Sequence, residues 1–125
     1  MTFSVTLPWP DRTLSPNVRL AWQARQDAKK AARDGAYALA FDAWDHVGIA
    51  WRLGPLAARY ELYPPNRRKI DIDNLVAMLK SAQDGVCIAL NINDSQIREA
   101  TYTLLDPVPG GKVVMTIQVL TEATP

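Results

Sequence analysis

The sequence predicts an α/β fold, a single-domain two-layer sandwich in which a mixed sheet is covered by two helices. Four segments have the apolar content or the apolar–polar alternation of strands, and two segments between them have helical composition. Their order along the chain is β-α-β-α-β-β. With 125 residues, of which 48% are hydrophobic, the chain has the size and apolar content of one domain spanning residues 1–125.

The first strand and the first helix are predicted in the N-terminal third. Residues 3–7 alternate apolar and polar side chains, as a half-buried strand does, and residues 11–19 have the composition of a loop. Residues 20–44 are rich in alanine, the best helix former, and only Gly35 interrupts them. We expect six residues to form the packed side of this helix: Leu20, Ala24, Ala28, Ala31, Leu39 and Trp44.

The second strand and the second helix are predicted on either side of a basic segment. Residues 56–63 carry alternate apolar side chains and end at a pair of prolines, which lack the N–H that a sheet needs. A good N-cap, Asp73 or Asn74, then begins a helix over residues 75–84. Gly85 is expected to stop that helix.

Two strands are predicted near the C-terminus, over residues 97–105 and 112–120. The intervening segment, residues 107–111, contains two prolines and two glycines, as turns do. A short turn between two strands favours direct pairing, so we expect these strands to form an antiparallel hairpin.

The charge of the chain is small but unevenly distributed. The net charge is +1, yet residues 1–70 carry eleven Lys/Arg and six Asp/Glu, whereas residues 71–125 carry three and seven. The basic half can contact phosphates and the acidic half can hold a metal. Ordinary scatter of surface charge is the alternative.

Other features exclude several classes of protein. No apolar run approaches the ~20 residues of a membrane span, and the N-terminus lacks the pattern of a signal peptide, so we expect a cytoplasmic protein. Cys87, the only cysteine, excludes an intramolecular disulfide and is expected to be a small buried hydrophobe. His46, the only histidine, has no partner motif and is expected to be structural or at the surface, which argues against His-based nuclease chemistry.

An acidic pair directly follows a basic run. Asp71 and Asp73 come after the three cations of residues 67–69. In an extended backbone, residues i and i+2 point to the same side, so the two carboxylates can converge on one ion. Such hard oxygen ligands suit Mg²⁺ or Mn²⁺ beside a phosphate. The cluster predicts a metal-dependent enzyme acting on nucleic acid; the alternative is that Asp73 is a helix cap and the basic run a solvated surface.

One lysine is placed to assist this chemistry. Lys80 follows Asp73 by seven residues, about two helical turns, and therefore lies on a similar face of the helix. From there it can reach a phosphate or help to position the nucleophile. The alternative is an ordinary solvent-exposed helix lysine.

Taken together, these segments resemble the RusA family of Holliday junction resolvases, which are small endonucleases common in phages and prophages. The matching pieces cover nearly the whole chain and are Leu7-Pro8-Trp9-Pro10, Ser15-Pro16-Asn17, the long basic helix, Arg67-Arg68-Lys69, Asp71-Ile72-Asp73-Asn74-Leu75, Lys80, Asp84-Gly85 and Asn93-Asp94-Ser95-Gln96. The resemblance implies a homodimer that binds four-way DNA junctions in recombination and repair and cuts two opposing strands symmetrically, with no organic cofactor.

The resemblance also implies the catalytic residues. They are Asp71, Asp73, Asp94 and Lys80, of which the three aspartates bind Mg²⁺, with Mn²⁺ as a substitute. Many members of the family carry the lysine four residues after the second aspartate, where this chain has Ala77, and two adjacent aspartates where this chain has Asn93. Because of these two differences, a catalytically inactive junction-binding module of prophage origin is an alternative function. A metal-binding or assembly protein unrelated to DNA is a third alternative.

The expected contacts with DNA are mainly electrostatic and come from two basic segments and a loop. The residues are Arg25, Lys29, Arg33, Arg67, Arg68, Lys69, Asn17 and Arg19. Phosphate contacts of this kind give strong salt dependence and little sequence preference. For Asn17 and Arg19, capping and packing of the first helix is the alternative. A C2 dimer would present two equivalent sites to a junction that is nearly two-fold symmetric.

Overall fold

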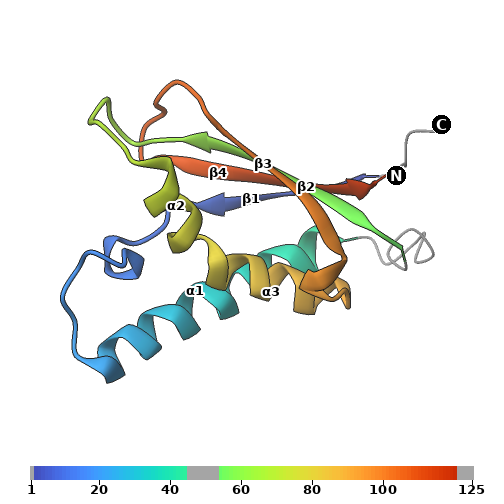
Figure 1. The fold of residues 1–125 in the computed structure, drawn as a ribbon, viewed down its shortest axis with the longest axis horizontal. Coiled ribbons are helices and arrows are strands. Elements are labelled where there is room, and N and C mark those ends of the chain that lie inside the picture. The colour runs from blue at the N-terminus through green and yellow to red at the C-terminus, as the bar shows by residue number, and fades with distance from the viewer. Residues whose placement is uncertain (1, 45–53, 121–125) are drawn as a thin grey trace.

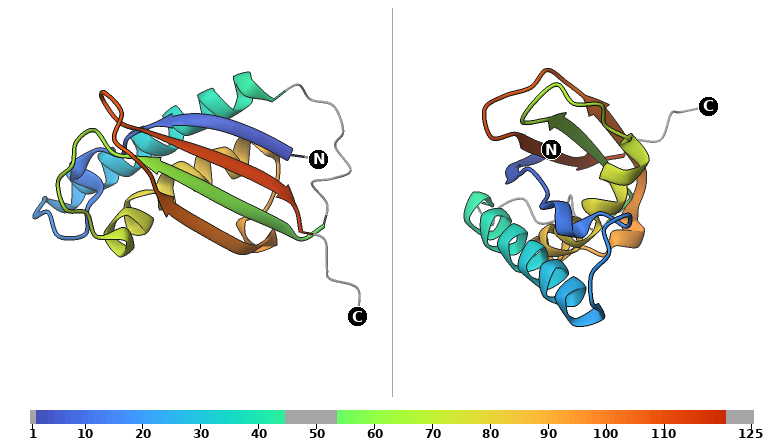
Figure 2. Two further views of the ribbon diagram at one scale, coloured as in Figure 1. Left: turned by 90° about the horizontal axis from the view of Figure 1, so that it is seen from above. Right: turned by 90° about the vertical axis from the view of Figure 1, so that its left-hand side faces the viewer.

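The computed structural model describes residues 2–44 and 54–120. In these residues a four-stranded mixed sheet, ordered β1-β4-β2-β3, is covered on one face by helices (Figures 1 and 2). The elements are β1 (Thr2–Pro8), the 3-10 turn η1 (Arg12–Leu14), α1 (Trp22–Ala43), β2 (Leu56–Tyr63), α2 (Ile72–Met78), α3 (Lys80–Leu90), the 3-10 turn η3 (Asp94–Gln96), β3 (Ile97–Leu104) and β4 (Lys112–Val119). The predicted α/β class and two-layer architecture are confirmed. The expectation for His46 lies outside the described residues.

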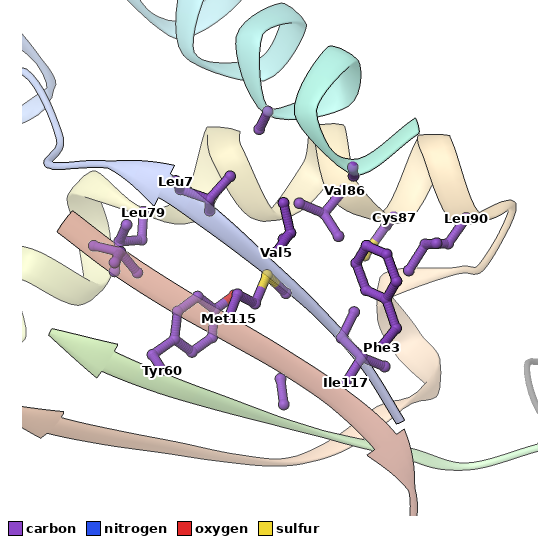
Figure 3. Packing of buried hydrophobic residues seen from close by; sticks show 14 of the residues in the cluster. Phe3, Val5, Leu7, Tyr60, Leu79, Val86, Cys87, Leu90, Met115 and Ile117 are labelled. Atoms are coloured by element: carbon purple, nitrogen blue, oxygen red, sulfur yellow. The ribbon is translucent and has the colours of Figure 1, made fainter. Parts of the chain in front are cut away.

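The alternation in the first two strands predicts their buried faces correctly. In β1 every second residue, beginning with Phe3, is buried, and the residues between them are exposed. Tyr60 and Leu62 of β2 are almost completely buried. Figure 3 shows that side chains from β1, β2, β4 and α3 meet between the sheet and the helices, where they form one core. Burial of such side chains is the main favourable contribution to folding.

The predicted antiparallel hairpin is wrong. β3 pairs with β2 in parallel, and β4 lies between β1 and β2, antiparallel to both. The segment between β3 and β4 therefore passes across the end of β2 (Figure 1). The burial of the two strands explains this order. β4 is largely buried, as a central strand is, whereas β3 is mostly exposed, as befits the edge of a sheet.

The predicted second helix is two helices, α2 and α3, which meet at Leu79. Asp71 is the N-cap of α2, so the assignment of the cap to Asp73 or Asn74 is wrong. Gly85 does not stop a helix but lies inside α3, which ends at Leu90 and is capped by Asn91 in a left-handed conformation (φ 56°). A Cβ at Gly85 would lie 2.1 Å from the carbonyl oxygen of Arg33, so this glycine lets α3 approach the backbone of α1.

The first helix is predicted to within two residues at each end, but its packed side is not. The buried residues of α1 are Ala36 and Ala40. Among the residues predicted to be packed, three are half-buried (Leu20, Ala28, Trp44) and three are exposed (Ala24, Ala31, Leu39). Many positions of this helix carry alanine, so the apolar pattern does not fix its rotation. The close contact with α3 at Gly85 fixes this rotation.

A membrane-spanning helix is absent from residues 2–44 and 54–120, because none of their helices has the necessary length and apolar content.

Candidate active site

The acidic turn at the start of α2 is built by a helix cap. The backbone of Asp71 is extended, and its Oδ1 accepts a hydrogen bond from the backbone N–H of Asp73 at 3.0 Å. Asp73 lies in the first turn of α2, so the two carboxylates are arranged around the start of a helix and not along a strand. Both side chains are exposed. One oxygen of Asp71 serves the cap, and the other oxygen and the Asp73 carboxylate remain available to a ligand from solvent.

A buried serine anchors this turn to the rest of the protein. Ser15 is 7% exposed, and its Oγ donates a hydrogen bond to Oδ1 of Asn74 at 3.1 Å. Arg25 of α1 in turn donates hydrogen bonds to the backbone oxygens of Ser15 and Val18. The loop after β1, the start of α2 and the basic helix are thus joined by one chain of hydrogen bonds. Buried polar groups with satisfied partners of this kind fix a local geometry.

The basic run directly precedes the acidic turn. Its residues, Arg67, Arg68 and Lys69, are all exposed. The Asn66 side chain accepts a hydrogen bond from the backbone N–H of Arg68 at 3.0 Å, which shapes the turn that presents them. A phosphate approaching Asp71 would therefore meet cations in the preceding residues.

The predicted basic face of α1 divides into two kinds of residue. Arg25 is half-buried, and its guanidinium donates hydrogen bonds to the loop, so it has a structural role, while its contact with DNA stays a prediction. Lys29 and Arg33 are exposed, as are Asn17 and Arg19 before the helix. The contacts of these residues with DNA stay predictions.

Lys80 lies between two carboxylates. Its Nζ is 3.0 Å from Oδ1 of Asp84, one turn later on α3, and 3.0 Å from Oδ2 of Asp94 on η3. The hydrogen bonds that Lys80 donates to Asp94 and then to Asp84 raise the pKa of Lys80, and the same bond to Asp94 lowers the pKa of Asp94. At neutral pH the lysine is therefore cationic and Asp94 is anionic.

Asp84 was not among the predicted site residues. The available signal was its spacing, because Lys and Asp four residues apart on a helix are neighbours on its surface. Sequence spacing does not reveal that a second carboxylate, from a separate turn, reaches the same ammonium group.

Asp94 is held by a capped 3-10 turn. The Asn93 side chain accepts a hydrogen bond from the backbone N–H of Ser95 at 2.9 Å, and Oε1 of Gln96 accepts one from the backbone N–H of Asn93 at 2.8 Å. Asn93 is thus the N-cap of the turn that presents Asp94. Asparagine and aspartate are about equally good caps, so Asn93 performs this structural role without a charge.

The donor chemistry of the acidic turn fits a hard divalent cation. Mg²⁺ is commonly bound by one or two carboxylates together with phosphate oxygens and water, and Asp71 with Asp73 supplies such a pair. Within residues 2–44 and 54–120, no three His, Cys, Asp or Glu side chains gather closely enough to hold a metal ion. Asp94 is instead paired with Lys80. The three-aspartate metal site therefore stays a prediction.

Two stacked tyrosines of the sheet lie beside α3, Tyr60 buried and Tyr102 half-buried. The rings of Tyr60 and Tyr102 stack with centroids 4.7 Å apart, and the hydroxyl of Tyr60 donates a hydrogen bond to the side chain of Gln83. Cys87 is 4% exposed, and burial, followed by the charges of Asp94 and Asp84, raises the pKa of its thiol to about 12. The expectation that Cys87 is a buried hydrophobe is confirmed, since a thiol with this pKa is not a nucleophile at neutral pH.

Comparison with known proteins gives relatives that match nearly the whole chain. The chain is 37% identical over 126 residues to an uncharacterized protein of Xylella fastidiosa, an alignment that covers 95% of this chain and 78% of that protein. It belongs to the same family as that protein. It is 29% identical over 118 residues to the crossover junction endodeoxyribonuclease RusA of Escherichia coli, which covers 93% of each chain, and equally to RusA of Shigella sonnei.

The chain is distantly similar to RusA. No family model matches it. The similarity to RusA extends over the strands, the helices and the candidate site, so it supports a nuclease of this general kind.

Proposed function

We propose that this protein is a Mg²⁺-dependent endonuclease that selects four-way DNA junctions and cuts two opposing strands as a homodimer. The observation that carries the proposal is the similarity to RusA over 93% of both chains. Three features support it: the exposed carboxylates of the acidic turn, the cations of the basic run before it, and Lys80, which is paired with Asp84 and Asp94. The phage or prophage origin in this proposal rests on the family resemblance alone.

In this proposal the basic residues bind and orient the DNA backbone. Arg67, Arg68 and Lys69 contact phosphates beside the acidic turn, and Lys29 and Arg33 extend the contact along α1. Because such contacts release counterions, binding weakens steeply as the salt concentration rises. Phosphate contacts alone carry little sequence information, so selectivity for a junction comes from its shape.

Asp71 and Asp73 would hold Mg²⁺ against the phosphate to be cut, with Asp94 as a further ligand. When bound, the ion supplies charge stabilisation at the phosphate and lowers the pKa of a coordinated water. Lys80 places its ammonium beside Asp94, where it can donate a hydrogen bond to a phosphate oxygen as negative charge develops there. The Ser15–Asn74 hydrogen bond keeps the turn in place while DNA binds.

A dimer is proposed because one chain offers one such site and resolution of a junction needs two cuts. A C2 dimer presents two equivalent sites to a junction with approximate two-fold symmetry. Cross-linking and analytical ultracentrifugation at assay concentrations test this part separately from the chemistry.

The test is cleavage of three synthetic DNA substrates, a four-way junction, a linear duplex and a single strand, with and without Mg²⁺. We expect paired nicks in the junction only when Mg²⁺ or Mn²⁺ is present. Asp73→Asn is expected to lower the cleavage rate by about 100-fold or more, because it removes a charged group at the reacting phosphate. Asp106→Asn, an exposed aspartate after β3, is the control and should cut normally.

Two outcomes would change the proposal. If Asp73→Asn cuts at the rate of the unmodified protein, the metal assignment is wrong. If the unmodified protein binds the junction tightly but never nicks it at any Mg²⁺ concentration, the protein is a junction-binding module and not a nuclease.

A further inference from the structure

Lys80 is held from two directions by groups on different elements. Asp84 lies one turn along the same helix, and Asp94 lies on η3 after the helix has ended. Both carboxylate oxygens are 3.0 Å from Nζ. The ammonium group has three N–H donors, so two are taken by the carboxylates and one remains for a further acceptor.

The two carboxylates differ in what fixes them. Asp94 is presented by the Asn93 cap on a separate turn, and in the proposed function DNA or metal would compete for it. Asp84 is fixed by the helix itself, because α3 continues for six residues beyond it to Leu90 and packs against α1 through the adjacent Gly85. Asp84 can therefore hold the lysine in place when Asp94 turns to another partner.

We propose that Asp84 is a positioning residue of the active site, which anchors the ammonium group of Lys80 to α3 so that it stays beside Asp94 and the substrate phosphate. This inference rests on the proposed function for its effect on cleavage, but the anchoring itself is a property of the protein without DNA.

The alternative is that Lys80–Asp84 is an ordinary surface ion pair. The three side chains are between 41% and 57% exposed, and exposed pairs contribute little to stability. The low contribution to stability helps the test, because loss of Asp84 should leave the fold intact and change only the position and mobility of the lysine.

The chain contains a matched control. Lys30 and Asp34 form an ion pair with the same four-residue spacing on α1, with Nζ and Oδ2 2.6 Å apart and side chains 67% and 53% exposed. This pair has the same spacing as Lys80 and Asp84 but lacks a second carboxylate from a separate turn among the described residues; Asp34 also lies 3.6 Å from Nε of Arg33. Asp34→Asn therefore measures what loss of an exposed carboxylate from surface ion pairs does to the cleavage step, and because Arg33 is a proposed DNA contact, its cleavage rate is compared at protein concentrations that saturate the junction.

The experiment compares Asp84→Asn, Asp84→Glu, Lys80→Met, the double variant Asp84→Asn/Lys80→Met, and Asp34→Asn. Single-turnover cleavage of a four-way junction and junction affinity without divalent metal are measured for each. Asp84→Asn is expected to lower the cleavage rate about 10- to 100-fold, as loss of orientation at a reacting group does, with unchanged affinity. Asp84→Glu should recover part of the rate, and Asp34→Asn should behave as the unmodified protein.

The double variant separates positioning from direct catalysis. If Asp84 acts through Lys80, then Asp84→Asn has no further effect once Lys80 is methionine. An equal loss of rate in both backgrounds would overturn the inference, because Asp84 would then act on the substrate or the metal by itself. An unchanged rate in Asp84→Asn would also overturn it.

A second measurement does not depend on cleavage. The NMR order parameter of the Lys80 ε-methylene group, in the protein without DNA, is expected to fall in Asp84→Asn and to stay unchanged in Asp34→Asn. If the unmodified protein does not cut junctions, the proposed function fails while this measurement still decides the anchoring. An order parameter that is the same with and without Asp84 would refute it.

Discussion

The contact of Gly85 with α1 yields the most decisive prediction about the fold. A Cβ at this position would lie 2.1 Å from the carbonyl oxygen of Arg33, and 3.0 Å from both the carbonyl carbon of Arg33 and the backbone nitrogen of Tyr37. These are backbone atoms, so no side chain can rotate away. Gly85→Ala therefore requires α1 and α3 to move apart.

The size of the effect follows from two opposing contributions. Overpacking of this kind costs about 1–3 kcal/mol. Alanine is favoured over glycine inside a helix by about 1 kcal/mol, which offsets part of the cost. Because a rigid main-chain oxygen is the main obstacle, we expect the packing cost to lie at the upper end and Gly85→Ala to be destabilised by roughly 1–2 kcal/mol in net terms.

Urea-induced unfolding, followed by circular dichroism, measures this difference. Gly35→Ala is the matched control, because Gly35 lies inside α1 and a Cβ there would have nothing within 4 Å. It should gain up to about 1 kcal/mol from helix propensity alone. If Gly85→Ala were stabilised as much as Gly35→Ala, the close packing of α1 on α3 would be wrong.

Two further predictions concern titratable groups. Cys87 should not react with a thiol reagent at pH 8 in the folded protein and should react fully in denaturant, because burial raises the pKa of its thiol to about 12; rapid reaction without denaturant would contradict the described core. The pKa of Asp94, followed by carboxyl ¹³C NMR, should lie below its usual value and rise in Lys80→Met, because the hydrogen bond from Lys80 lowers it. A carboxyl with a lowered pKa contributes its full stabilisation above its unfolded-state pKa and loses it as the pH falls through its folded-state pKa. Lys80→Met should therefore remove the contribution of Asp94 to the decrease in the free energy of unfolding at acid pH. Identical titrations of Asp94 in both proteins would show that the pair does not form in solution.

Local patterns predicted those elements whose structure depends on their own residues. The alternation from Phe3 to Leu7 is sufficient to define the buried face of β1, and the alanine-rich segment defines α1. The strand order was not predictable in this way. The turn chemistry at Gly110 and Gly111 is compatible with a hairpin, but the burial of β4 places it in the middle of the sheet and leaves β3 at the edge.

The candidate site shows the same division between local and tertiary information. The spacing of Asp71 and Asp73 was evident in the sequence, but their geometry depends on where α2 begins, and a shift of the cap from Asp73 to Asp71 changes which oxygens are available. The sequence does not predict Asp84 as a site residue, because its role requires Asp94, ten residues later, to reach the same ammonium group. Such a meeting is a property of the folded chain.

The position of β4 has a consequence for biosynthesis. Of the strands in the described residues, β4 is the last to emerge from the ribosome, yet it lies between β1 and β2, with Thr2 opposite Gln118 and Leu56 opposite Val119. Until it arrives, β1 has no neighbour in the sheet, and its apolar face can be shielded only by the helices. Pairing between such distant segments slows folding and prolongs the exposure of unpaired strand edges. A nascent chain that stalls before residue 112 should therefore be a substrate for chaperones and proteases, whereas emergence of β4 should allow the sheet to assemble.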